Sequence, residues 1–157
     1  MLGRFSPGFL GFLPLVFLPS LSFGASIQKP ATDVSQHECA QIAQSYVVER
    51  LAVWQQRLKL DDWKISVIMS HPSDLKPKTL GNIHWDADKK SAIIRVLDAS
   101  DYQLSCRDML DDMEFTVVHE LIHLELSSLP RSDASRRDEE YAVNQITDAL
   151  LRLDRRK

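Results

Sequence analysis

The chain has 157 residues, of which 44% are hydrophobic and 26% are charged. This length and apolar content are enough for one domain with a buried core, and they exclude a disordered tail. The formal net charge is −3 and the cations are dispersed apart from a basic C-terminus, a distribution that argues against a nucleic-acid partner.

The first 24 residues differ in composition from the rest of the chain. Arg4 precedes an almost wholly apolar run over 9–23, and Ser22 and Gly24 are the small residues expected before a cleavage after Gly24. This pattern is typical of a secretory signal peptide, whereas a membrane anchor is disfavoured because the run is short and contains two prolines. We therefore expect a secreted or periplasmic protein without stable membrane insertion, with a linker over 25–34 and one domain over 35–157.

The pattern of the domain predicts three helices and about three strands. Ser35 and Glu38 have capping-box spacing, and apolar residues then recur at helical intervals to about residue 59. Alternation and β-branched residues predict a strand over 63–69 and a hairpin with arms at 79–85 and 91–97. Further helices are expected from Ser105 to about Leu126 and over 134–153. The expected fold class is α+β, with a small, mostly antiparallel sheet.

The two cysteines are Cys39 and Cys106. An even number in a chain expected to reach an oxidising compartment favours one disulfide. Two buried free thiols are the alternative, because the sequence does not show how close the two Cα atoms lie.

The stretch Val117–Leu126 carries two histidines four residues apart in an apolar run of a predicted helix. At this spacing His119 and His123 lie on one helix face and can share one metal ion. Zinc suits two imidazoles at this spacing, and Glu120 can reach a water on the ion without binding the ion. The alternative is a pair of core or surface histidines.

Catalytic zinc sites have a third protein ligand, and two glutamates at the start of the last predicted helix are candidates. Glu139 falls near the centre of the apolar face of that helix. Glu140 has Asn144 one turn later, whose amide can hydrogen-bond a ligand imidazole. The choice between them stays open on these grounds, and an acidic first turn that complements the helix dipole is the alternative for both.

The motif His119-Glu120-Leu121-Ile122-His123, followed by a glutamate on a separate helix, resembles the gluzincin branch of the zincin zinc metallopeptidases. In that branch the glutamate ligand is commonly followed by Asp or Asn four residues later, which ranks Glu140 ahead of Glu139. The order of elements and the stretch Gly81-Asn82-Ile83-His84-Trp85-Asp86 look like minimal single-domain gluzincins. The resemblance implies a zincin-like fold whose sheet edge, here 79–85, lies above the metal and can align an extended peptide.

The resemblance further implies Zn²⁺ as cofactor, a peptide or protein substrate, and amide hydrolysis by zinc-bound water activated by Glu120. No downstream motif for stabilising the oxyanion is recognisable. His84, Tyr102 and Tyr141 are candidates for that role, with ordinary packing as the alternative. The competing hypotheses are a catalytically inactive zincin-fold module that binds metal and holds a partner peptide on its edge strand, and a zinc-free structural domain.

Overall fold

The computed structural model describes residues 36–130 and 132–156. The expected signal peptide over 1–24 and the linker over 25–34 lie outside the described residues, as does Ser35 of the expected capping box. No helix in the described ranges is long and apolar enough to cross a membrane.

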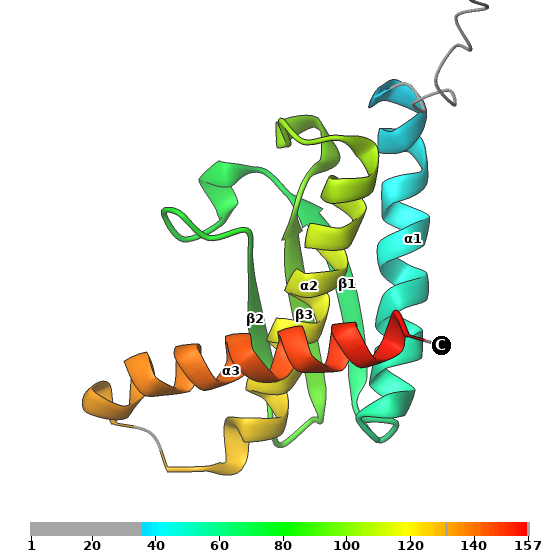
Figure 1. Cartoon of the computed structure of the whole chain (residues 1–157). Coiled ribbons are helices and arrows are strands. Elements are labelled where there is room, and N and C mark those ends of the chain that lie inside the picture. The colour runs from blue at the N-terminus through cyan, green and yellow to red at the C-terminus, as the bar shows by residue number, and fades with distance from the viewer. Residues whose placement is uncertain (1–35, 131, 157) are drawn as a thin grey trace, which may run out of the picture. The chain divides into compact units, whose positions relative to one another are not determined.

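Three α-helices and one three-stranded sheet make up the described part of the chain (Figure 1). In chain order they are α1 (Gln36–Arg57), β1 (Lys64–Ser70), β2 (Gly81–Asp86), β3 (Ser91–Leu97), α2 (Cys106–Glu125) and α3 (Asp133–Asp154). Short 3-10 turns at Pro72–Asp74, Ala99–Asp101 and Leu126–Ser128 lie between them. The expected α+β class is confirmed, and each element lies close to its expected position.

The prediction of a mostly antiparallel sheet is wrong, because the sheet is mixed. Its strand order is β1-β3-β2, and β3 pairs antiparallel with β2 but parallel with β1. The expected hairpin of β2 and β3 is present. However, the connection over 71–80 leaves a gap between β1 and β2, and β3 then fills this gap. Two side chains of β3, Ile94 and Val96, are fully buried, so the strand with the deepest burial takes the centre, where neighbours satisfy both of its edges.

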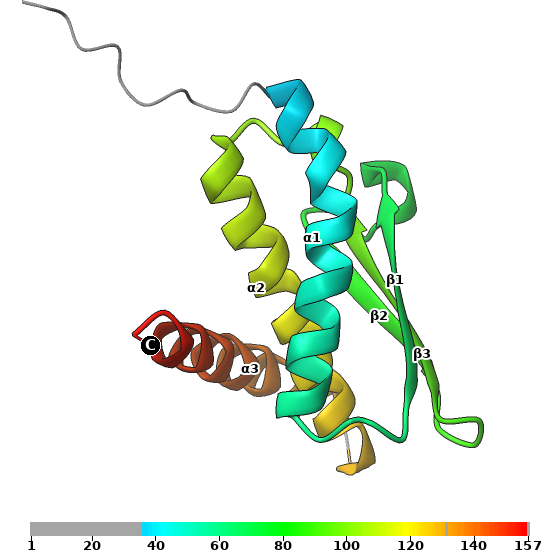
Figure 2. The same ribbon diagram turned by 90° about the vertical axis from the view of Figure 1, so that its right-hand side faces the viewer.

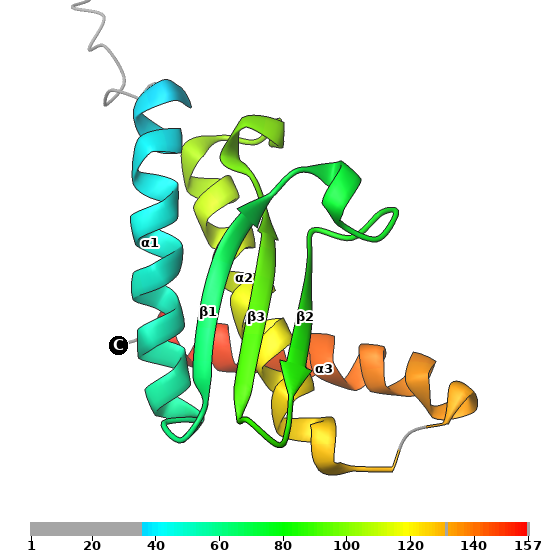
Figure 3. The same cartoon turned by 180° about the vertical axis from the view of Figure 1, so that it is seen from behind.

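The core lies between one face of the sheet and the helices α1 and α2. Figure 2 shows these two helices covering that face, with α3 crossing α2 on the side away from the sheet. The opposite face of the sheet is not covered by any described element (Figure 3). Fully buried side chains from all these elements fill the core, among them Val47, Ile94, Met113, Val117, Leu121 and Val143. This packing holds α2 firmly between the sheet and α3.

Two further links fasten α1 to α2. A disulfide joins Cys39 to Cys106, whose Cα atoms are 5.6 Å apart. Deeper in the core, the buried carboxylate of Glu114 accepts hydrogen bonds from Arg50 Nε at 2.6 Å and Trp54 Nε1 at 2.7 Å. Because Arg50 also pairs with Asp154 at 3.2 Å, the same network reaches α3.

Candidate metal centre

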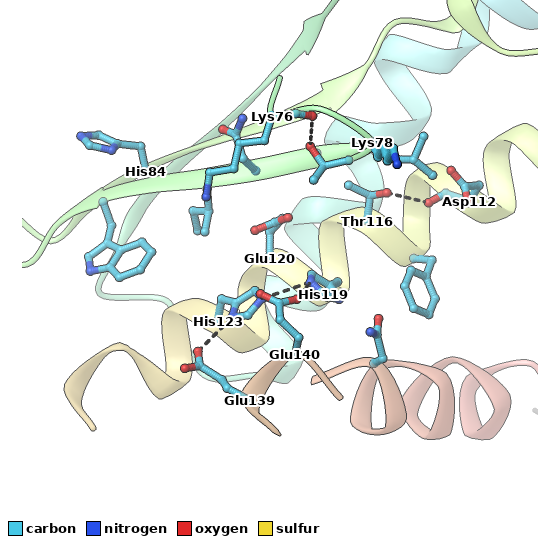
Figure 4. Close-up of a pocket in the computed structure, with 18 residues that line it drawn as sticks. Lys76, Lys78, His84, Asp112, Thr116, His119, Glu120, His123, Glu139 and Glu140 are labelled. Atoms are coloured by element: carbon cyan, nitrogen blue, oxygen red, sulfur yellow. Dashed lines mark hydrogen bonds and ion pairs between the residues drawn. The ribbon is translucent and has the colours of Figure 1, made fainter. Parts of the chain in front are cut away.

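The helix α2 positions the two motif histidines. It begins at the expected cap, where the Ser105 hydroxyl donates to the Asp108 carboxylate at 2.7 Å and accepts from the Asp108 N–H at 3.2 Å. One stripe of the helix is buried against the sheet and α1. The neighbouring stripe, which carries His119, Glu120 and His123, faces a cleft between β2 and α3 (Figure 4).

His119, His123 and Glu140 converge at the floor of this cleft. The Nε2 atoms of the two histidines are 3.1 Å apart. The Glu140 carboxylate lies between them, with Oε1 at 3.3 Å from His123 Nε2 and Oε2 at 3.5 Å from His119 Nε2. Donors about 2.1 Å from a tetrahedral zinc ion lie about 3.4 Å from one another. The distances among the donor atoms of these three side chains therefore already match the distances among zinc ligands.

Glu139 lies behind His123 rather than beside both rings. Its Oε1 is 3.1 Å from Nδ1 of His123, the nitrogen that faces away from Glu140. The Glu139 side chain is 14% exposed, against 52% for Glu140. A carboxylate on the second ring nitrogen holds a metal-binding histidine in one tautomer and one orientation. The two glutamates, which the sequence offered as alternatives for one role, thus occupy two different places.

Asn144 approaches the other histidine from the next turn of α3. Burial, followed by the charge of His123, lowers the pKa of His119, while Glu140 and Asn144 act in the opposite direction. The lowered pKa keeps the His119 ring neutral, which is the form that binds a metal ion. Its Nδ1 is buried and has no hydrogen-bond partner of ordinary geometry among the described residues.

Glu120 lies beside the three converging groups and is 7% exposed. No described side chain donates a hydrogen bond to it. Burial, followed by repulsion from Glu140, raises the pKa of Glu120 to about 7, against the attraction of Lys76. A carboxyl group with a pKa near neutrality is suited to accept and return a proton.

The strand β2 passes directly over Glu120, and Gly81 makes this close approach feasible. A Cβ at Gly81 would collide with the Thr116 side chain and stand 2.7 Å from the carbonyl oxygen of Arg95. The same position is 3.7 Å from Glu120 Oε1. Only a residue without a side chain fits here, so β2 forms a close roof over the carboxylate.

The cleft has a volume of about 730 Å³. The loop before β2 and β2 itself form one wall, and α2 and the start of α3 form the rest, with 18 lining residues drawn in Figure 4. A cleft of this size suits a compact ligand or a few residues of an extended chain. Sequence reasoning missed Lys76 and Lys78, which line the upper wall, because a loop lysine shows no motif.

The three residues considered for an oxyanion are placed differently. His84 lines the cleft from β2. Tyr102 is buried and donates its hydroxyl hydrogen to Asp112 at 2.8 Å, and Tyr141 is 69% exposed; neither lines the cleft. In Figure 4 the His84 ring lies on the far side of β2 from His119, His123 and Glu140, as strand alternation predicts when Gly81 faces α2. None of the three residues considered is therefore placed to stabilise an oxyanion at the floor of the cleft.

A second cluster of metal-binding residue types lies where β1 and β3 end. It comprises His71, Asp98 and Asp101. His71 Nδ1 lies 2.7 Å from Asp101 Oδ2, and Asp98 accepts hydrogen bonds from the backbone and hydroxyl of Ser100. The His71 side chain is 64% exposed, as expected for a surface residue, and these polar groups satisfy one another.

No family model, curated protein or solved structure matches the chain.

Proposed function

We propose that the protein is a small zinc metallopeptidase of the gluzincin type that hydrolyses peptide bonds. His119, His123 and Glu140 bind the ion, and Glu120 is the general base. The observation that carries the proposal is the spacing of about 3.1 to 3.5 Å among these three donors, beside a buried carboxyl group without a donor. These three residues would hold the ion, and three protein ligands are the usual number in catalytic zinc sites, which keep a further position for water or substrate.

The donor set favours zinc over harder cations. Two imidazole nitrogens and one carboxylate form a common catalytic zinc site, whereas magnesium and calcium prefer oxygen ligands throughout. When bound, zinc supplies Lewis-acid chemistry, because it lowers the pKa of a water and polarises a carbonyl group.

The residues of the chain then have separate tasks. The Glu120 carboxylate takes a proton from the attacking water and passes it to the leaving amine, since it stands next to the donors and has no competing partner. Glu139 holds the His123 ring through Nδ1. Asn144, on the next turn of α3, favours the protonated form of His119 and thus lies within reach of its ring.

The edge strand supports a peptide as the substrate. The Leu97 N–H donates to the Leu80 carbonyl oxygen at 2.8 Å, and the register continues this pairing from Asn82 to Arg95 and from His84 to Ile93. In an antiparallel ladder the residues between such pairs, here Gly81 and Ile83, turn their N–H and C=O groups outward. An extended peptide can add to this open edge directly above the donors.

The proposal is tested by metal analysis of the purified protein together with digestion of a broad peptide library. We expect one equivalent of zinc, its loss in His123→Ala and its retention in the matched control His71→Ala. Glu120→Gln keeps the metal and loses cleavage by about a hundredfold or more, the usual effect of removing a general base. Cleavage that survives Glu120→Gln rejects the mechanism, and stoichiometric zinc without turnover favours the inactive peptide-binding module instead.

We also propose that the protein acts outside the cytoplasm, either secreted or in a periplasm. The disulfide between Cys39 and Cys106 supports an oxidising compartment. N-terminal sequencing of the exported protein tests this, with a start at Ala25 expected. An intact N-terminus on a cytoplasmic protein contradicts it.

A further inference from the structure

The loop before β2 places two lysines at the opening of the cleft. Leu75 is buried at 8% exposure and anchors the start of this loop. The carbonyl oxygen of Lys76 then accepts two hydrogen bonds from Thr79, one from its N–H at 3.1 Å and one from its hydroxyl at 2.8 Å. Lys78 adopts a left-handed backbone conformation, with φ of 65°, within this turn. The turn therefore holds both lysines on the upper wall.

These lysines differ from others near the same strand. Lys89 and Lys90 pair with Asp86 and Asp62, whereas neither Lys76 nor Lys78 forms an ion pair among the described residues. In Figure 4 the Lys76 side chain reaches from the loop toward the part of the cleft above Glu120, and the two charges attract each other.

The wall formed by the loop and β2 is positive, because its lining residues include Lys76 and Lys78 and no carboxylate. The four carboxylates that line the cleft, which are Asp112, Glu120, Glu139 and Glu140, all lie on α2 and α3. A bound divalent cation would offset two of these charges, while Glu139 pairs with His123 and Asp112 accepts a hydrogen bond from Tyr102. Neither lysine forms an ion pair with these carboxylates in the described structure, so both ammonium groups are available to a ligand. A cleft with low-dielectric walls focuses such a field and attracts ligands of opposite charge.

We propose that Lys76 forms a carboxylate subsite, to which Lys78 adds positive charge further along the same wall, and that this subsite selects substrates carrying an acidic side chain or a free C-terminal carboxylate beside the scissile bond. This inference rests on the proposed peptidase function, and it names the substrate class. The subsite lies next to the reacting position because Lys76 neighbours Glu120, the proposed base. An ammonium group forms strong charge-assisted hydrogen bonds with a carboxylate, and the same charges disfavour a basic side chain.

The test measures binding separately from cleavage. Fluorescently labelled peptide pools with a randomised sequence carry a fixed central Glu, Gln or Lys and an amidated C-terminus, and a fourth pool carries Gln and a free C-terminus. Anisotropy with the zinc-loaded Glu120→Gln variant gives the affinity of each pool. We expect the Glu pool or the free-acid pool to bind about tenfold more tightly than the amidated Gln pool, and which of the two does so identifies the source of the carboxylate.

Charge reversal in the same background makes the test specific. Lys76→Glu is expected to abolish the preference for the carboxylate and to favour the Lys pool, and Lys78→Ala to weaken the preference. Lys89→Ala, a lysine outside the cleft with a 78% exposed side chain, is the matched control and leaves it unchanged. Circular dichroism confirms that each variant is folded.

The outcomes separate the subsite from the peptidase. Equal binding of the Glu, free-acid and amidated Gln pools, or a preference that survives Lys76→Glu, overturns the subsite. Cleavage by the wild-type protein without any preference keeps the peptidase and overturns the subsite. Selective binding without cleavage by the wild-type protein supports the subsite while the peptidase proposal fails.

Discussion

Two buried glutamates on α2, Glu114 and Glu120, stand in opposite surroundings. Their exposures are nearly equal, at 5% and 7%. Glu114 accepts hydrogen bonds from Trp54, Arg50 and Tyr46, whereas no described side chain donates one to Glu120. A buried charge is tolerated when donors surround it and is costly when they are missing. Burial alone therefore does not separate a structural carboxylate from one suited to proton transfer, but the donors around it do.

The largest expected effect comes from removing the partnered carboxylate. Glu114→Ala leaves Arg50 and the Trp54 N–H without their buried acceptor, and we expect a loss of about 3 to 5 kcal/mol in the free energy of unfolding. Urea denaturation measures this loss. The exposed Glu49→Ala on α1 is the control and should change stability by less than about 0.5 kcal/mol. Similar values for both variants would show that the network contributes little.

The lack of hydrogen-bond donors around Glu120 should make the free energy of unfolding depend on pH. The folded, metal-free protein holds a proton on Glu120 up to a pKa of about 7, above the ordinary value of 4.5. The unfolded chain has already lost that proton, so the free energy of unfolding falls as pH rises between these values. The expected decrease, relative to Glu120→Gln, is about 3 kcal/mol.

Chelator-treated wild type and Glu120→Gln are compared in urea from about pH 4 to about pH 8, across the range in which the two states bind different numbers of protons. His119, whose lowered pKa contributes with the opposite sign, is present in both proteins and largely cancels. Parallel pH profiles of wild type and Glu120→Gln would mean that Glu120 has an ordinary pKa and is not shielded from water.

Gly81 offers a way to disturb the roof over Glu120. The Cβ of Gly81→Ala collides with Thr116, so β2 must move away from α2, and we expect a loss of about 1 to 3 kcal/mol from overpacking. Water then reaches Glu120, and the pH difference from the preceding comparison should shrink. His84→Ala, an exposed position on the same strand, is the control. A pH profile that Gly81→Ala leaves unchanged would show that the close approach of β2 does not cause the raised pKa of Glu120.

Glu139 resembles Glu114 because it has a hydrogen-bond partner, and it resembles Glu120 because it lies beside the candidate metal site. Glu139→Ala removes the acceptor from His123 Nδ1, and we expect a 10- to 100-fold loss of zinc affinity, about 1.4 to 2.7 kcal/mol. Competition with a chromogenic chelator measures this loss. Glu140→Ala should lose more, because it removes a proposed ligand; the reverse order would exchange the roles of the two glutamates.

Part of the site could be predicted from local periodicity. Residues four apart on a helix share a face, so the common direction of His119 and His123 follows from the motif and from the apolar pattern around it. The positions of Glu139 and Glu140 could not be predicted in the same way, because they depend on how α3 crosses α2. Lys76 and the donors of Glu114 gave no sequence signal, since they meet their partners only through packing between distant segments.

The sequence by itself determined the α+β class, the position of each helix and strand, and the cap at Ser105. Each of these depends on hydrogen bonds and apolar periodicity within a few residues, which any local stretch displays. Only the tertiary structure decided that β1 lies parallel to β3, which donors surround Glu114, and that Glu140 faces both rings while Glu139 stands behind His123. These features depend on the energy of packing whole elements together, and that energy selects strand direction and side-chain partners without leaving a periodic pattern in the chain.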